Sequence, residues 1–136
     1  MLNWSKISTV LLDMDGTILD LHFDNHFWLE HFPTRYSEQH GISIEESKQK
    51  LMERYLDLSG TIEWYCLDYW TEFTQMPMPL IKREVQHLIQ LREDADEFLT
   101  ALKQSGREVI LVTNAHPDAL SLKIERTQLD KYFDVL

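Results

Sequence analysis

Two short aliphatic runs, separated by a long stretch with helical spacing, set the pattern of apolar positions along the chain. Residues 7–12 are aliphatic with little alternation, which predicts a strand covered on both faces. Residues 108–112 form a second run of this kind, and residues 133–136 are typical of the start of a third strand. Strands separated by helices predict parallel β-α-β units joined by right-handed crossovers.

Between the first two runs, apolar residues recur at the spacing of amphipathic helices. The sequence SIEE at 43–46 is a capping box and predicts a helix that closes at residues 59–60. Thr61 is expected to cap a second helix, which continues to the breaking sequence MPMP at 76–79. Further helices are predicted over 80–91, 94–104 and 117–128.

The helical insertion after the first strand spans about seventy residues, which is more than a plain crossover needs. We therefore predict an α/β fold with an incomplete parallel sheet of about three strands. Residues 1–19 together with 91–136 form its core, and residues 20–90 form a small all-helical cap.

Composition narrows the classes of function. The net charge of −10 argues against a nucleic acid polymer as a partner, because such binding needs clustered Lys and Arg. A small anionic substrate is compatible with this charge if a metal cation neutralises the site. The single cysteine fits a reducing compartment. Residues 1–6 lack the apolar stretch of a signal peptide and residues 7–12 cannot span a bilayer, so we expect a cytoplasmic protein without a membrane partner.

Two carboxylates follow the first predicted strand. Asp13 and Asp15 are two residues apart at the carboxyl end of that strand, where parallel sheets bind ligands. Gly16 permits a sharp turn after them. One carboxylate can act as an ionised nucleophile and metal ligand while the other exchanges a proton. The plain alternative is a solvated turn that holds two acids.

The sequence VLLDMDGT at 10–17 resembles motif I of the haloacid dehalogenase-like hydrolase superfamily, and LVTN at 111–114 resembles its motif II. The helical segment between them resembles the C1-type cap of that superfamily. The resemblance covers the chain in order. It implies a HAD-like Rossmannoid core and phosphoryl transfer, which depends on positioning and charge neutralisation.

The resemblance also implies roles for individual residues. Asp13 attacks phosphorus and forms an aspartyl-phosphate, and Asp15 protonates the leaving oxygen and then activates water. A carboxylate oxygen of Asp13 and the backbone carbonyl of Asp15 bind Mg²⁺. Thr113 and Asn114 bind the phosphate. The carbon–halogen branch of the superfamily lacks an acid at the position of Asp15, so this chain is expected to act on phosphate monoesters.

A closer resemblance links the chain to the bacterial GMP/IMP 5′-nucleotidases of this superfamily. It rests on LDL at 19–21, FDN at 23–25, WYCLDYW at 64–70, LRED at 91–94 and TNAHP at 113–117. It implies a purine nucleoside 5′-monophosphate as substrate; the alternative is a sugar phosphate or another small phosphorylated metabolite. The substrate contacts that it suggests are Asp24, Asn25, Trp64, Tyr65, Tyr69 and His116.

Each of these contacts has a structural alternative. The aromatic run is expected to pack in the core, with one ring able to stack on a purine. Asp24, Asn25 and His116 are equally compatible with helix starts in contact with solvent. Histidines 22, 26 and 31 recur at nearly helical spacing, but a zinc site there lacks a fourth ligand. Cys66 is expected to be a small buried apolar residue, and Lys123 a solvated one.

The superfamily uses two further motifs, a lysine after the third strand and an acidic pair after the fourth. Neither is found before Leu136, so the expectation is a truncated core with weak metal binding and an unpaired sheet edge. The alternative function of another class is therefore a non-catalytic remnant that self-associates through this edge.

Overall fold

The computed structural model describes all residues of the chain, 1–136, and its centre is a two-stranded parallel sheet. Strands β1 (Thr9–Leu12) and β2 (Glu108–Leu111) pair in register along their whole length. On the other side of β2, Leu111 N–H donates to Val135 O at 2.9 Å. The parallel α/β core is confirmed, and the expected third strand is reduced to a single bridge between Ile110 and Val135.

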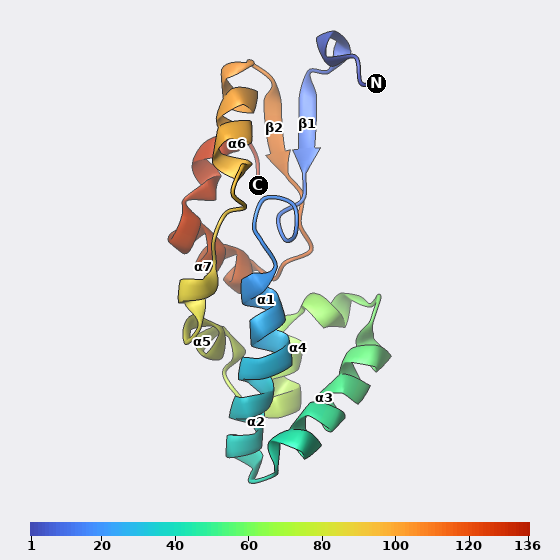
Figure 1. Cartoon of the computed structure of the whole chain (residues 1–136). Helices are drawn as coiled ribbons and strands as arrows, with labels where there is room; N and C mark the ends of the chain where they lie inside the picture. Colours follow the sequence, from blue (N-terminus) through green and yellow to red (C-terminus); the bar gives the residue numbers. More distant parts are fainter.

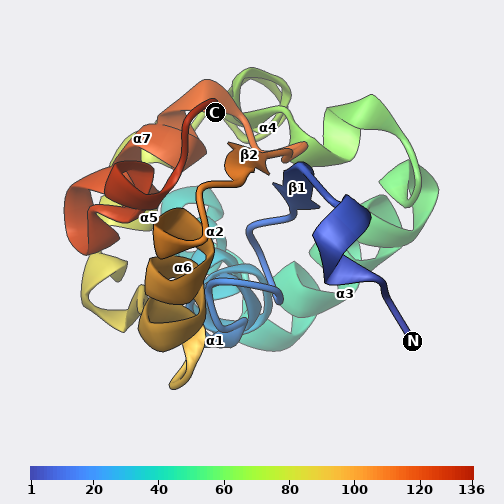
Figure 2. The ribbon, with the colours of Figure 1, turned by 90° about the horizontal axis from the view of Figure 1, so that it is seen from above.

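Helices α6 (Ala95–Gln104) and α7 (Pro117–Thr127) lie on one side of this sheet, as Figures 1 and 2 show. The expectation of a first strand covered on both faces is wrong, because Leu11 is 64% exposed. Val109 and Leu111 of β2 are buried. Burial alternates along the strands because helices cover one face of the sheet.

The helical insertion leaves and re-enters the core at one place. Leu19 and Leu91 form an antiparallel bridge, and Arg92 N–H donates to Ile18 O at 2.9 Å. Figure 1 shows the inserted helices beyond the carboxyl ends of the strands. They are α1 (His22–His26), α2 (Phe32–His40), α3 (Ile44–Leu58), α4 (Leu67–Thr74) and α5 (Met78–Arg83). We propose this crossing as the boundary between the core and a cap of residues 20–90.

The N-cap of the predicted capping box is confirmed, since Ser43 Oγ accepts the Glu46 N–H at 3.1 Å, whereas the Glu46 carboxylate pairs with Lys50. The expected cap at Thr61 is wrong, because its hydroxyl donates to Leu58 O instead. The predicted helix after it is divided into a 3₁₀ turn, η3 (Ile62–Tyr65), and α4. The division occurs at Cys66, whose backbone is extended.

Helix α5 begins at Met78, two residues before its expected start, because Pro79 fits the first turn of a helix. It ends at Arg83, and a 3₁₀ turn, η4 (Gln86–Leu88), replaces the rest of the predicted helix. Between α1 and α2, residues Phe27–His31 form a π-helical turn that keeps the two helices in one continuous run. None of the helices has the length and apolarity needed to cross a bilayer.

Aromatic side chains fill the centre of the inserted segment. Phe27, Phe32 and Trp70 are completely buried, and Trp70 Nε1–H donates to Trp64 O at 3.1 Å. Trp28 stacks on Trp64 with ring centroids 5.5 Å apart. The expectation that the aromatic run packs in the core is confirmed for Trp70. Trp28 and Trp64 of this cluster line the cavity described below.

Candidate active site

The ends of β1 and β2 lie side by side, because Val112 N–H donates to Leu12 O at 2.8 Å. Asp13, Thr113 and Asn114 follow these ends and line one open hollow of about 330 Å³. Thr113 Oγ1 accepts the Ala115 N–H at 3.1 Å, which leaves the hydroxyl proton available to a ligand. The structure thus brings together the predicted nucleophile and the two predicted phosphate-binding residues.

A tight loop carries Asp15 away from this hollow. Met14 is fully buried, and its carbonyl accepts the N–H groups of Thr17, Ile18 and Leu19. Gly16 has a φ of +78°, the left-handed conformation that favours glycine. The chain therefore leaves the extended conformation directly after β1, and Asp13 and Asp15 line different hollows.

Asp15 lines a cavity of about 290 Å³ between the sheet ends and the inserted helices. Several predicted substrate contacts lie around it. The cavity is lined by Asp15, Leu21, Asp24, Asn25, Trp28, Leu29, Tyr55, Trp64, Tyr65, Leu67, Lys82, Ala115, His116, Ala119 and Lys123. Tyr69 lies outside this cavity, where its hydroxyl accepts a hydrogen bond from Arg54. The cavity thus has an aromatic wall and a charged floor.

The charged floor is a four-membered network. Lys123 Nζ lies 2.6 Å from Asp15 Oδ1 and 2.8 Å from Asp24 Oδ2. Lys82 Nζ lies 3.8 Å from Asp24 Oδ1 and 4.3 Å from the centre of the Phe27 ring. The expectation of a solvated Lys123 is wrong, because its side chain is only 2% exposed. Two ammonium groups therefore balance two carboxylates.

Both lysines have a signal in the sequence that reasoning from residue type misses. Lys123 lies four positions after Ala119 in α7, and Lys82 lies four positions after Met78 in α5. Residues four apart share one face of a helix, and Ala119 and Met78 are both buried. Helical phase therefore places each lysine toward the core.

Burial changes the acidity of two members of this network. Burial raises the pKa of the Asp15 carboxyl above its ordinary value, although the Lys123 ammonium opposes the change. Burial lowers the pKa of Lys82 to about 8, against the opposing effect of Asp24. A carboxyl whose pKa is raised is better suited to proton transfer near neutral pH than a solvated one.

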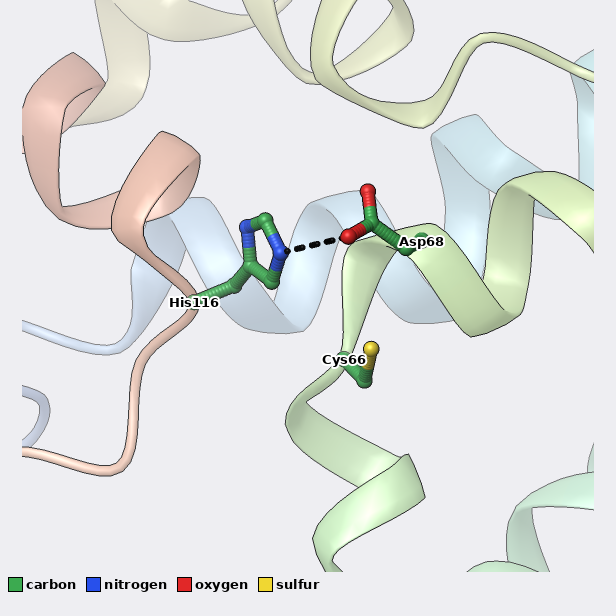
Figure 3. Close-up of side chains that lie close together, drawn as sticks. All are labelled: Cys66, Asp68 and His116. Atoms are coloured by element: carbon green, nitrogen blue, oxygen red, sulfur yellow. Dashed lines mark hydrogen bonds and ion pairs between the residues drawn. The ribbon is translucent and has the colours of Figure 1, made fainter.

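His116 caps the start of α7, where its Nδ1 accepts the Asp118 N–H at 3.2 Å. Its Nε2 lies 3.4 Å from Asp68 Oδ2 on α4, so the histidine joins the core to the inserted segment (Figure 3). Cys66, expected to be buried, is partly exposed beside them.

The three histidines at which a zinc site was considered are His22, His26 and His31. The ring centroids of His22 and His26 are 6.3 Å apart, and those of His26 and His31 are 6.4 Å apart. His31 Nε2 lies 3.1 Å from Glu84 Oε1 instead. They form no cluster with metal-binding spacing in this structure.

Comparison with known proteins gives the chain a consistent set of relatives. The family model for haloacid dehalogenase-like hydrolase matches residues 7–136. The GMP/IMP nucleotidase YrfG of Escherichia coli strain K12 is 44% identical over 133 residues, which are 98% of this chain and 60% of that protein. The chain thus spans about 60% of the length of this relative.

Solved structures agree on the fold. The HAD phosphatase from Thermococcus onnurineus superposes with a TM-score of 0.79 at 24% identity, over 95% of this chain and 60% of that one. A HAD-superfamily hydrolase of subfamily IA from Geobacter sulfurreducens superposes with a TM-score of 0.57 at 21% identity, over 95% of this chain and 61% of that one.

Proposed function

The chain belongs to the haloacid dehalogenase-like hydrolase family. On this premise we propose that it is, or is part of, an enzyme that hydrolyses small phosphate monoesters. The proposed substrates are purine nucleoside 5′-monophosphates, GMP and IMP. The observation that carries this proposal is the 44% identity to a GMP/IMP nucleotidase over 98% of this chain. The proposed compartment is the cytoplasm.

In the proposed reaction, an Asp13 carboxylate oxygen attacks phosphorus and the phosphorus–oxygen ester bond breaks. Asp15, which lines the second cavity, gives its proton to the leaving alkoxide, so the proposal requires a substrate that reaches both hollows. Asp15 then takes a proton from the water that attacks the aspartyl-phosphate, which releases inorganic phosphate and restores the Asp13 carboxylate. The raised pKa of the Asp15 carboxyl supports its part in both proton transfers. The free hydroxyl proton of Thr113 supports its role as a donor to a phosphoryl oxygen.

Mg²⁺ is the cofactor that this proposal includes. The donor set fits a hard cation, since the Asp13 carboxylate and the Asp15 carbonyl offer oxygen atoms only. The Asp13 carboxylate is exposed, and no hydrogen bond or ion pair of the structure engages it. When bound, Mg²⁺ would neutralise charge on the phosphoryl oxygens.

The aromatic wall of the cavity supports a nucleoside over a bare sugar. Tyr65 lines the cavity and is partly exposed, so its ring has a face available to a planar base. The Trp64 ring already stacks on Trp28. Asp24 and Asn25 line the same cavity and offer hydrogen-bonding groups. Their proposed partners are ribose hydroxyls or base edges. A sugar phosphate remains the alternative substrate.

A panel assay tests this proposal. Phosphate release is measured with Mg²⁺ from GMP, IMP, other nucleotides and sugar phosphates, for the chain and for any longer protein that contains it. We expect GMP and IMP to be preferred and Asp13→Asn to abolish turnover, whereas the exposed control Asp130→Asn keeps it. Preference for a sugar phosphate would reject the nucleotide substrate alone. Turnover by Asp13→Asn would reject Asp13 as the nucleophile.

The second candidate function is self-association through β1. The edge of β1 that faces away from β2 carries no partner strand, and Leu11 within β1 is exposed. An unpaired edge with apolar side chains is a template for strand pairing with another molecule. Light scattering after size-exclusion chromatography tests this candidate, and a monomer at high concentration contradicts it.

A further inference from the structure

Three side chains with different metal-binding atoms meet at the seam between the inserted segment and the core. The Cys66 Sγ, an Asp68 carboxylate oxygen and a His116 ring nitrogen all lie within 4.8 Å of one another. Figure 3 shows the three side chains facing one another from the start of α4 and the start of α7. We propose that they form a binding site for a transition-metal ion of the Zn²⁺ class, separate from the Mg²⁺ site at Asp13.

The spacing of the two harder ligands fits one shared ion. His116 Nε2 and Asp68 Oδ2 are 3.4 Å apart. Two atoms bound to one tetrahedral zinc at about 2.0–2.1 Å are separated by about 3.4 Å. The nitrogen and the oxygen could therefore bind the same ion with little movement. Cys66 supplies the third ligand, and three protein ligands leave the fourth position open to water or another small molecule.

The donor types select the class of metal. Mg²⁺ and Ca²⁺ bind oxygen atoms, whereas thiolate and imidazole bind Zn²⁺ and its first-row neighbours more strongly. Cys66 is the only cysteine of the chain and lies at the extended break between η3 and α4. Asp68 lies two residues after Cys66, so both side chains project from the same break in the chain.

The other ring nitrogen of His116 has a suitable neighbour. Without metal, Nδ1 accepts the Asp118 N–H, so the ring proton is on Nε2 and faces Asp68. A metal at Nε2 requires the proton to move to Nδ1, which ends the hydrogen bond from the Asp118 N–H. There, Asp118 Oδ2 lies 3.8 Å away and can accept it after a small adjustment. A carboxylate that accepts from the second nitrogen is the usual support of a metal-binding histidine.

Occupancy of this site would tie two parts of the molecule together. Cys66 and Asp68 belong to the inserted segment, whereas His116 begins the helix that follows β2. His116 also lines the cavity that contains Asp15. A bound ion would therefore fix the inserted segment against the core on one side of the cavity.

Titration of the chain with Co²⁺ tests the site without an activity assay. Thiolate ligation gives a charge-transfer absorption in the near ultraviolet, and this band can come only from Cys66, the sole cysteine. We expect one equivalent of Co²⁺ to produce the band together with the visible absorption of a tetrahedral ion. Zn²⁺ should displace Co²⁺ and remove both absorptions.

Variants separate this site from other histidines. Cys66→Ser should remove the charge-transfer band, and Asp68→Asn should weaken Co²⁺ binding by about tenfold or more. Asp68 is 83% exposed, so its substitution leaves the fold intact. His26→Ala is the matched control and should bind Co²⁺ like the original chain. The absence of the band, full affinity in Asp68→Asn, or an equal loss in His26→Ala would each overturn the proposal.

Discussion

The Lys123 ammonium donates a hydrogen bond of 2.6 Å to the Asp15 carboxylate. The two residues are far apart in the chain, and Lys123 holds Asp24 of α1 as well. Because the lysine side chain is almost inaccessible to water, its charge depends on these carboxylates for stabilisation. The pair joins the proposed proton donor to the helix that opens the inserted segment.

Lys123→Met should lower the free energy of unfolding by about 2–4 kcal/mol. The substitution keeps most of the buried volume but leaves Asp15 and Asp24 without their shared cation, and both carboxylates are largely buried. Their partial contact with water limits the loss. Urea denaturation at pH 7 measures it, and Lys131→Met, at an exposed lysine, should change stability by less than about 0.5 kcal/mol. Equal stability of the two variants would contradict the importance of the bridge.

Lys82 should make the chain more stable as the pH rises above 8. Burial lowers its pKa in the folded state to about 8 from an ordinary value of 10.5. Between these values the unfolded chain binds more protons at Lys82 than the folded chain, so the free energy of unfolding increases with pH. The contribution between pH 8 and pH 9.5 is about 1–2 kcal/mol.

Denaturation curves at a series of pH values test this slope. Lys82→Met removes the titrating group and should flatten the rise relative to the original chain. Asp15, Asp24 and Lys123 face Lys82 and stay in place in both proteins. Lys131→Met again serves as the control, since it should retain the rise. A variant Lys82→Met with an unchanged slope would refute the assignment.

The elements that local rules determine could be predicted from the sequence. The capping box at Ser43 places the start of α3, and the aliphatic runs place β1 and β2 within one or two residues. Asp13, Thr113 and Asn114 meet because the carboxyl ends of parallel strands share one edge of the sheet.

The parts that failed depend on contacts between distant residues. The break at Cys66 accompanies the hydrogen bond from Trp70 to Trp64 and the stacking of Trp64 on Trp28. The local sequence pattern predicts neither of these contacts. Lys123 finds its carboxylates 99 and 108 positions away, so its residue type alone suggested solvent.

Trp70→Ala should destabilise the chain by about 3–5 kcal/mol. Trp70 is completely buried among several aromatic rings, and its indole N–H has a partner in Trp64 O. The substitution leaves a large cavity and removes the N–H group that donates a hydrogen bond to the Trp64 carbonyl. Thermal and urea denaturation measure the loss. The control Leu56→Ala changes a residue that is 70% exposed, and its stability should stay within about 0.5 kcal/mol of the original chain.

Ser43→Ala should cost about 1 kcal/mol, because it removes the side chain that accepts the Glu46 N–H at the start of α3. Ser59, at the other end of the same helix, makes no side-chain hydrogen bond in the structure. Ser59→Ala is therefore the matched control. Equal effects of the two substitutions on the urea midpoint would show that the cap contributes nothing.

The bridge between Leu19 and Leu91 holds together the two chain segments that connect the inserted segment to the core. Asp15 precedes this bridge in the chain and Asp24 follows it, and Lys123 donates a hydrogen bond to each. If the inserted segment moved so that Asp24 left Lys123, the negative charge of Asp24 would no longer raise the pKa of Asp15, and the proton affinity of the Asp15 carboxyl would fall. By reciprocity, any movement of the inserted segment that changed the proton affinity of Asp15 would itself depend on the protonation of Asp15. The position of the inserted helices and the charge of the Asp15 carboxyl would therefore be coupled.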